Sequence, residues 1–200
     1  MKLLYSPTSP YARKVRITVI EKGLADRVEI VGVDVLGKPD TVRASNPLAK
    51  IPALVLDDGT SLFDSPVICE YLDTLAPTPV LLPKGAARWG VLRRQALADG
   101  VMDAAFNLVM ERRRPEALRS EEWMARWTAA MSNAIAALDA ELPAETPAFD
   151  LGWIAAIAAV DYVEFRLGDL GLLKATAKLA AWRALMADRP SVAASAPPKG

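Results

Sequence analysis

The sequence predicts a two-domain protein, with a small α/β domain first and an all-helical domain after it. Three observations lead to this fold class. Short strand and helix patterns alternate over residues 1–76. Residues 77–86 contain three prolines, which is typical of a linker between domains. Over residues 87–200 the strand patterns stop, and long helical patterns take their place.

The N-terminal domain is expected to have the element order β-α-β-α-β-β-α, which implies a mixed sheet covered by helices. Short apolar or alternating runs mark the strands, and the Asp58-Gly59 pair is a strong hairpin signal between the last two. The expected strands are residues 2–5, 27–33, 53–56 and 61–63, and the expected helices are residues 11–22, 38–44 and 66–75.

The C-terminal domain is expected to contain four longer helices and an irregular tail. The third is apolar on every side, so we expect it to be the buried central helix. The tail is rich in Ala, Ser and Pro, a composition that favours irregular structure. The expected helices are residues 87–113, 120–142, 150–168 and 174–187.

Composition excludes several kinds of site and partner. The chain has no histidine, so it cannot build a Ser-His-Asp triad or a histidine-ligated zinc site. Its single cysteine, Cys69, excludes an internal disulfide, thiolate zinc sites and iron–sulfur clusters, and is consistent with a reducing cytoplasm. Lys plus Arg equals Asp plus Glu at 24 each, so charge does not indicate a nucleic-acid or membrane partner.

We also expect neither a secretion signal nor a membrane-spanning segment. The chain opens on a strand-like segment rather than a cleavable leader. Its longest strongly apolar stretch, residues 151–163, is interrupted by Asp161 and is too short to span a bilayer. We therefore expect a cytoplasmic protein that binds no metal, nucleic acid or membrane.

Ser9-Pro10-Tyr11-Ala12 follows the first expected strand and opens the first expected helix. A helix N-terminus offers free N–H groups and the positive end of the helix dipole, an environment that stabilises thiolates. The segment resembles the Cys-Pro-Tyr-Cys loop of a glutaredoxin without its sulfurs, which suggests that a ligand brings the sulfur. On this segment alone, an ordinary serine N-cap is the simpler interpretation.

A second motif runs from Asn46 to Leu54 and leads into a strand. Pro52 at the strand start cannot donate a ladder hydrogen bond. If the Ile51–Pro52 bond is cis, the backbone N–H and C=O of Ile51 are free to pair with an extended peptide. Most X-Pro bonds are trans, so this motif is weak alone.

The third motif, Phe63-Asp64-Ser65-Pro66, turns a strand into a helix. We expect Ser65 to be the N-cap and Pro66 the first helical residue. A helix start with an added hydroxyl can bind a carboxylate, while Asp64 can hold an ammonium group. The motif therefore fits the α-amino acid head of a ligand, with a simple helix cap as the alternative.

Asp99 and Asp103 lie four residues apart on the helix after the linker, so their carboxylates share one face. Such a pair is usually a solvated stripe. It could also line an interdomain cleft or a dimer interface.

The three motifs, taken in their order and spacing, resemble the glutathione transferase superfamily over essentially the whole chain, and most closely its short bacterial members that use serine. They are Ser-Pro-Tyr-Ala-Arg-Lys-Val from Ser9, Asn-Pro-Leu-Ala-Lys-Ile-Pro-Ala-Leu from Asn46, and Phe-Asp-Ser-Pro-Val-Ile-Cys-Glu-Tyr-Leu from Phe63. The resemblance implies a thioredoxin-like N-terminal domain, a cis peptide bond before Pro52, glutathione as cosubstrate, no metal, and a homodimer.

The resemblance also implies roles for individual residues. Ser9 would be the catalytic hydroxyl that faces the glutathione sulfur. Ile51, followed by Pro52, would pair with the cysteinyl unit, and Asp64 with Ser65 would hold the γ-glutamyl head.

Further residues are implied less directly. Lys50 would approach the glycine carboxylate of glutathione. Tyr11, Asp99 and Asp103 are additional candidates, with Asp99 reaching across a dimer to the γ-glutamyl amine.

The chain departs from the family pattern at the helix that begins after Asp150. That helix usually has a Ser or Thr N-cap and an Asp three residues later, which together make a capping box. Here Asp150 can cap, but Trp153 occupies the third position, so reciprocal capping is lost.

The implied activity is glutathione transfer to a small apolar electrophile, in detoxification. Ser9 would hold the thiol as thiolate, so no general base is needed and the lack of histidine is no obstacle. Two alternatives stay open: a non-catalytic binding or regulatory protein of this fold, and a glutathione-dependent isomerase, dehalogenase or peroxidase.

Overall fold

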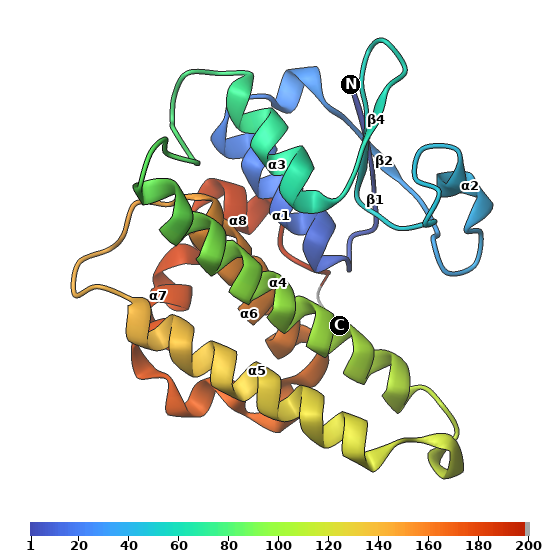
Figure 1. Ribbon diagram of the computed structural model, residues 1–200, viewed down its shortest axis with the longest axis vertical. Helices are drawn as coiled ribbons and strands as arrows, with labels where there is room; N and C mark the ends of the chain where they lie inside the picture. The colour runs from blue at the N-terminus through green and yellow to red at the C-terminus, as the bar shows by residue number, and fades with distance from the viewer. Residues whose placement is uncertain (199–200) are drawn as a thin grey trace. The chain divides into compact units, whose positions relative to one another are not determined.

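The structure is a computed structural model that describes residues 1–198 and divides into two compact units (Figure 1). The N-terminal unit comprises Met1–Arg88 together with the described residues from Pro190 on, and the helical unit is Trp89–Arg189. The expected fold class is confirmed, because all four strands of the sheet lie in the N-terminal unit and residues 89–189 are helical or irregular.

The N-terminal unit is built on a four-stranded mixed sheet with the strand order β2-β1-β3-β4. Its strands are β1 (Lys2–Tyr5), β2 (Glu29–Gly32), β3 (Ala53–Val55) and β4 (Ser61–Leu62). β1 runs parallel to β2 and antiparallel to β3, and β4 runs antiparallel to β3. In the register Leu4 faces Ala53 across β1 and β3, and Leu54 faces Leu62 across β3 and β4.

The helices of the N-terminal unit are α1 (Pro10–Glu21), α2 (Asp40–Arg43), α3 (Ser65–Thr74) and α8 (Pro190–Ala194), with a 3-10 turn at Ala25–Arg27. α1 and α3 lie side by side (Figure 1), and α8 packs against α1. The structure therefore has a short helix where the composition predicted an irregular tail. Packing explains the difference, because Val192 of α8 is 2% exposed.

A buried ion pair fixes the proline-rich segment after α3 to the N-terminal unit. The Nζ of Lys22 lies 2.8 Å from Asp73 Oδ1, 2.7 Å from the carbonyl oxygen of Ala76 and 2.5 Å from that of Pro79. The Asp73 carboxylate also accepts the backbone N–H groups of Leu81 and Leu82. The Lys22 side chain is 1% exposed, so each of its three donors is satisfied inside the protein.

The helical unit surrounds one buried helix. Its helices are α4 (Ala87–Arg112), α5 (Glu121–Glu141), α6 (Leu151–Leu167) and α7 (Ala177–Met186), with 3-10 turns at Glu116–Leu118, Gly168–Leu170 and Leu172–Ala175. Every residue from Ile154 to Val160 is 0% exposed, so the expected central helix is α6. Within residues 1–198, no helix has the length and hydropathy needed to cross a membrane.

The start of α6 is capped by Asp150, which is itself bound by an arginine of the helical unit. Asp150 is the N-cap, and its Oδ1 accepts the Trp153 N–H at 3.0 Å. The guanidinium of Arg94 lies 3.2 Å from Asp150 Oδ2 and 4.3 Å from the Trp153 ring centroid. Burial raises the pKa of the Asp150 carboxyl above its ordinary 3.8, against the opposing effects of the Trp153 N–H and Arg94. Arg94 thus supports the cap where the capping box is missing.

Candidate functional site

The three sequence motifs meet at one edge of the sheet. β1 ends shortly before Ser9, β3 begins directly after Pro52, and β4 ends two residues before Asp64. Because β1 and β4 both run antiparallel to β3, the end of β1, the start of β3 and the end of β4 lie at the same edge. α1 and α3 start from this edge and pack together, so their two N-termini lie there as well.

Ser9 is the N-cap of α1, with extended backbone angles of φ −82° and ψ 119°. Its Oγ accepts the backbone N–H of Ala12 at 3.2 Å, and its own backbone N–H donates to the Ser6 carbonyl at 3.1 Å. Pro10 occupies the first helical position, where no N–H is needed. The half-buried Ser9 hydroxyl acts here as an acceptor, so its proton can be donated to a ligand.

Pro52 places Ile51 just outside the sheet ladder. The Ile51–Pro52 peptide bond is cis, as the resemblance implied. The first paired residue of β3 is Ala53, so the backbone of Ile51 lies beyond the last residue pair. Lys50, directly before it, has an exposed side chain.

Asn46 organises this loop, a role that was not predicted from the sequence. Its side-chain Nδ2 donates to the Lys50 carbonyl at 2.9 Å, and its Oδ1 accepts the Leu48 N–H at 3.0 Å. Asn46 is 3% exposed, and Ala49 inside the loop adopts a left-handed φ of 51°. The Asn-Pro pair was the available signal, because an Asn side chain often bonds the backbone two residues ahead.

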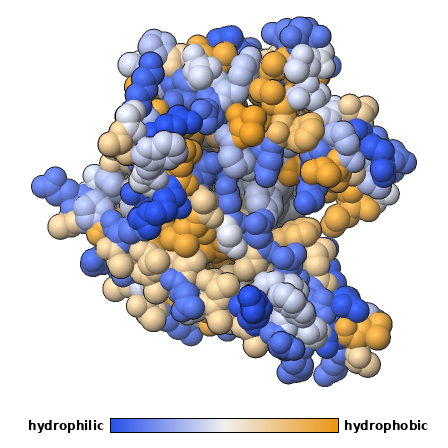
Figure 2. Space-filling model, in the orientation of Figure 1, coloured by the Kyte–Doolittle hydropathy of each residue, from blue (hydrophilic) through white to orange (hydrophobic). Residues whose placement is uncertain are grey.

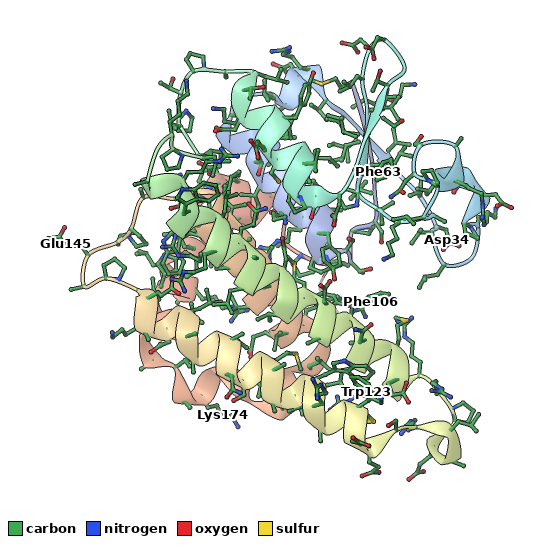
Figure 3. The ribbon with its side chains drawn as sticks, viewed as in Figure 1. Asp34, Phe63, Phe106, Trp123, Glu145 and Lys174 are labelled. Atoms are coloured by element: carbon green, nitrogen blue, oxygen red, sulfur yellow. The ribbon has the colours of Figure 1, made fainter. Side chains whose placement is uncertain are left out.

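At the start of α3 the cap lies one residue earlier than expected. Asp64 is the N-cap: its carboxylate accepts the Ser65 N–H, and its carbonyl accepts the Ile68 N–H at 3.0 Å. Ser65 is therefore the first helical residue, and the prediction of Ser65 as the cap is wrong. Figure 3 labels Phe63, which stands where the chain leaves β4 for α3.

The Ser65 hydroxyl is the most unusual group at this edge. Ser65 is 0% exposed, and its Oγ has no hydrogen-bond partner among the described residues. A buried polar group without a partner costs about 1–3 kcal/mol. Beside it are the free N–H groups at the α3 N-terminus and the exposed carboxylate of Asp64. This arrangement can bind a carboxylate and an ammonium group together.

The remaining candidates lie on α1, α3 and α4. Tyr11 is half-buried in the first turn of α1. Asp99 and Asp103 are on α4, where Asp99 is half-buried and Asp103 is exposed. Cys69 is buried in α3, and its Sγ accepts the Thr18 hydroxyl at 3.4 Å.

Across residues 1–198, the structure has no group of three or more His, Cys, Asp or Glu side chains that could hold a metal ion.

A family model, a sequence relative and solved structures all place this chain near the glutathione transferases. The model of the glutathione S-transferase N-terminal domain matches residues 8–75. The uncharacterised glutathione-transferase-like protein YibF of Escherichia coli is 36% identical over 170 residues, which cover 83% of each chain.

Two solved structures extend the likeness to the whole chain. A glutathione transferase family member from Pseudomonas fluorescens Pf-5, with bound glutathione, is 38% identical and gives a TM-score of 0.95 over 99% of both chains. It has also been solved with S-(propanoic acid)-glutathione. A glutathione S-transferase from Methylobacillus flagellatus with glutathione bound is 39% identical, with a TM-score of 0.91 over 98% of this chain and 99% of that one.

Fold, motifs and relatives agree on one class, that of proteins with a thioredoxin-like N-terminal domain and an appended helical region. This chain belongs to the glutathione S-transferase superfamily.

Proposed function

We propose that this protein is a glutathione transferase in which Ser9 holds the bound thiol as thiolate. The observation that carries the proposal is the buried Ser65 hydroxyl, which has no described partner and stands at the sheet edge where Ser9 caps α1. The similar proteins solved with glutathione support glutathione as the ligand.

Each part of glutathione has a complementary group. The γ-glutamyl carboxylate binds the Ser65 hydroxyl and the N–H groups at the start of α3, and its ammonium binds Asp64. The cysteinyl backbone pairs with Ile51 beside Pro52 in the manner of an added strand. Lys50 attracts the glycine carboxylate. The sulfur then lies at the N-terminus of α1.

Ser9 lowers the pKa of the bound thiol by donating its hydroxyl proton to the sulfur as a hydrogen bond. A free thiol has a pKa of about 8.5, so only a few per cent is ionised at neutral pH. A hydrogen bond to a charged group contributes about 1.5–3 kcal/mol, which corresponds to a pKa lowered by about 1–2 units. The helix N-terminus acts in the same direction.

The thiolate attacks a small electrophile. A new S–C bond forms while a leaving group departs with its electron pair, or while a C=C bond opens and its carbon takes a proton from water. The relative solved with S-(propanoic acid)-glutathione supports conjugation of this kind and extends the proposed acceptors from apolar molecules to small ones with a polar end.

The proposal includes a cytoplasmic homodimer. Exposed apolar side chains support a second copy as partner: Leu48 is 66% exposed and Val67 is 50% exposed, and apolar patches are visible on the face in Figure 2. Tyr11, Asp99 and Asp103 stay candidates for secondary contacts with glutathione or the partner. Sedimentation equilibrium of the purified protein tests the dimer.

The first experiment is an ultraviolet difference titration of bound glutathione against pH, comparing the parent protein with Ser9→Ala. We expect a thiol pKa well below 8.5 in the parent and a rise of about 1–2 units in Ser9→Ala. Turnover with a model electrophile should fall more than glutathione affinity. Ser6→Ala is the matched control, because Ser6 is a neighbouring serine whose hydroxyl lies 3.3 Å from Thr8 Oγ1.

Two results would contradict the proposal. An unchanged thiol pKa and turnover in Ser9→Ala would remove the role of Ser9. If millimolar glutathione does not bind the parent protein, the fold serves a non-catalytic interaction instead.

A further inference from the structure

The chain returns to the N-terminal unit after the helical unit is complete. Residues 190–195, here called the C-terminal clasp, include α8 and pack against α1. Three of its side chains are almost fully buried: Ser191 is 1% exposed, Val192 is 2% exposed and Ser195 is 0% exposed. The clasp is therefore part of the packed interior of the N-terminal unit.

Two arginines of α1 bind the clasp. Arg13 Nε lies 3.4 Å from Ser195 Oγ, and Arg13 Nη2 lies 3.3 Å from the Val192 carbonyl. Arg16 donates to the Ala194 carbonyl at 2.9 Å and to the Ser195 carbonyl at 3.4 Å. The last carbonyls of a helix have no partner within it, and the guanidinium groups supply these missing donors.

A third contact joins the far end of α1 to the clasp. The Ser191 hydroxyl donates to Glu21, the last residue of α1. The clasp therefore contacts α1 at both ends of a line that runs from Arg13 to Glu21. A helix held along its length cannot tilt or slide without breaking several of these bonds.

Arg13 is the residue of this set nearest to the proposed glutathione site. It lies one helical turn after Ser9 and is 4% exposed, and its backbone N–H donates to the Ser9 carbonyl at 3.0 Å. Loss of the clasp would remove two acceptors of the buried Arg13 guanidinium, and a buried donor that loses its acceptor is favoured to move toward water. Such a movement would displace the first turn of α1, where Ser9 and the free N–H groups lie.

We propose that Arg13 and Arg16 are positioning residues for the thiolate site, which they hold in place by binding the C-terminal clasp. This inference rests on the proposed function for the identity of the ligand. A hydroxyl and helix N–H groups stabilise a thiolate only if they stay within about 0.5 Å of the required geometry. The bound thiol pKa therefore depends on residues far along the chain. Arg13 and Ser195, which are in contact, are separated by 182 positions.

The test uses the chain of residues 1–200 and a graded set of its variants. Ser195→Ala removes one acceptor, Arg13→Gln removes the guanidinium, Arg13→Lys keeps the charge but not the two-pronged donor geometry, and a deletion of residues 190–200 removes the clasp. Arg27→Gln is the matched control, because Arg27 is an exposed arginine of the same unit. Each variant is measured for bound thiol pKa, glutathione affinity, melting temperature and hydrogen exchange of the Ala12 amide.

We expect the bound thiol pKa to rise by about half a unit or more in Arg13→Gln and in the deletion, and by less in Ser195→Ala. Arg13→Lys should restore part of the shift, and Arg27→Gln should show none. Exchange of the Ala12 amide, which donates to Ser9 Oγ, should become about tenfold faster in the same order.

The proposal is overturned if folded variants keep the parent thiol pKa and the parent exchange rate at Ala12, even when their melting temperature falls. Full restoration by Arg13→Lys would also overturn it, because charge rather than position would then be the cause. If the deletion does not fold, Ser195→Ala and Arg13→Gln decide. If the parent does not bind glutathione, the proposed function fails, but the exchange rate at Ala12 still tests the positioning by the clasp.

Discussion

The N-termini of α3 and α6 contain the same kinds of group but satisfy them differently. At α6 the Asp150 carboxylate binds the Trp153 N–H and the Arg94 guanidinium, so each is a partner that the protein itself supplies. At α3 the Asp64 carboxylate accepts one N–H, while the neighbouring Ser65 hydroxyl is buried without a described partner. Both helices begin with an Asp N-cap, as the capping rules predict. They differ because only the start of α3 has a buried hydroxyl without a described hydrogen-bond partner.

The difference separates a scaffold from a binding site. A polar group whose donors and acceptors are all bound within the protein contributes to stability and has nothing left to offer a ligand. A polar group that the protein buries and leaves unsatisfied lowers stability until a ligand completes it. We therefore expect substitutions at satisfied groups to change unfolding free energy, and substitutions at Ser65 to change glutathione affinity.

The largest effect is expected at Lys22, the most completely satisfied charge described above. Lys22→Met leaves the buried Asp73 carboxylate without its cation and should lower the free energy of unfolding by about 3–5 kcal/mol. Urea unfolding followed by circular dichroism measures the change. The control is Lys2→Met, because Lys2 is 62% exposed and lies 3.7 Å from Glu29. Similar losses in both variants would contradict the assignment of Lys22 as a structural charge.

Asp150→Ala should have the next largest effect. It removes the α6 cap, worth about 1 kcal/mol, and a hydrogen bond between charged groups, worth about 1.5 kcal/mol, so we expect a loss of about 2–3 kcal/mol in unfolding free energy. Glutathione affinity, measured by calorimetry on the folded protein, should stay the same. Asp169→Ala breaks an exposed pair with Arg112 and should cost less than about 1 kcal/mol.

Ser65→Ala should show the opposite pattern. The variant loses a hydrogen bond to the γ-glutamyl carboxylate, so glutathione should bind about 30-fold more weakly, a change of about 2 kcal/mol. Unfolding free energy in the absence of glutathione should stay the same or increase, since no described partner is lost. A variant that is less stable yet binds glutathione normally would break the comparison between the two helix starts.

The smallest effect concerns pH. Burial raises the pKa of Asp150 in the folded protein above its ordinary 3.8, so the folded state holds this proton more tightly than the unfolded state. The contribution of Asp150 to stability is then largest below pH 3.8 and falls as pH rises through the raised pKa. Asp150→Asn lacks this titration, so the stability difference between parent and variant should decline across that acidic range. A difference that grows with pH there would contradict the direction of the shift.

The motifs predicted which residues form the site. Which of their polar groups have hydrogen-bond partners could be seen only in the folded structure. Ser9 is the N-cap of α1 and the Ile51–Pro52 bond is cis, as the residues and their resemblance implied. Asp64 and Ser65 are both good caps by residue type, so the sequence could not decide which one has non-helical backbone angles. Whether Ser65 Oγ finds a partner depends on neighbours from other segments, and no local pattern records them.

The helices also differ in whether their own sequence or distant contacts determine them. The hydrophobic pattern predicted α6 as a buried helix because apolar residues cover all its sides. It did not predict α8, a helix of only five residues that Arg13 and Arg16 of α1 hold through the Val192 and Ala194 carbonyls. Asn46 is a different case, because its two hydrogen bonds reach only two and four residues ahead and the Asn-Pro pair is a local signal for them.

The docking of the C-terminal clasp on α1 has a consequence for biosynthesis. A ribosome that has released residues 1–88 has made every strand of the sheet, but α1 still lacks the segment that covers Arg13. At about 5–20 residues per second, the 101 residues of the helical unit take about 5–20 s to translate. During this interval the nascent N-terminal unit exposes one side of α1 to chaperones and proteases, and translation through Ser195 closes it.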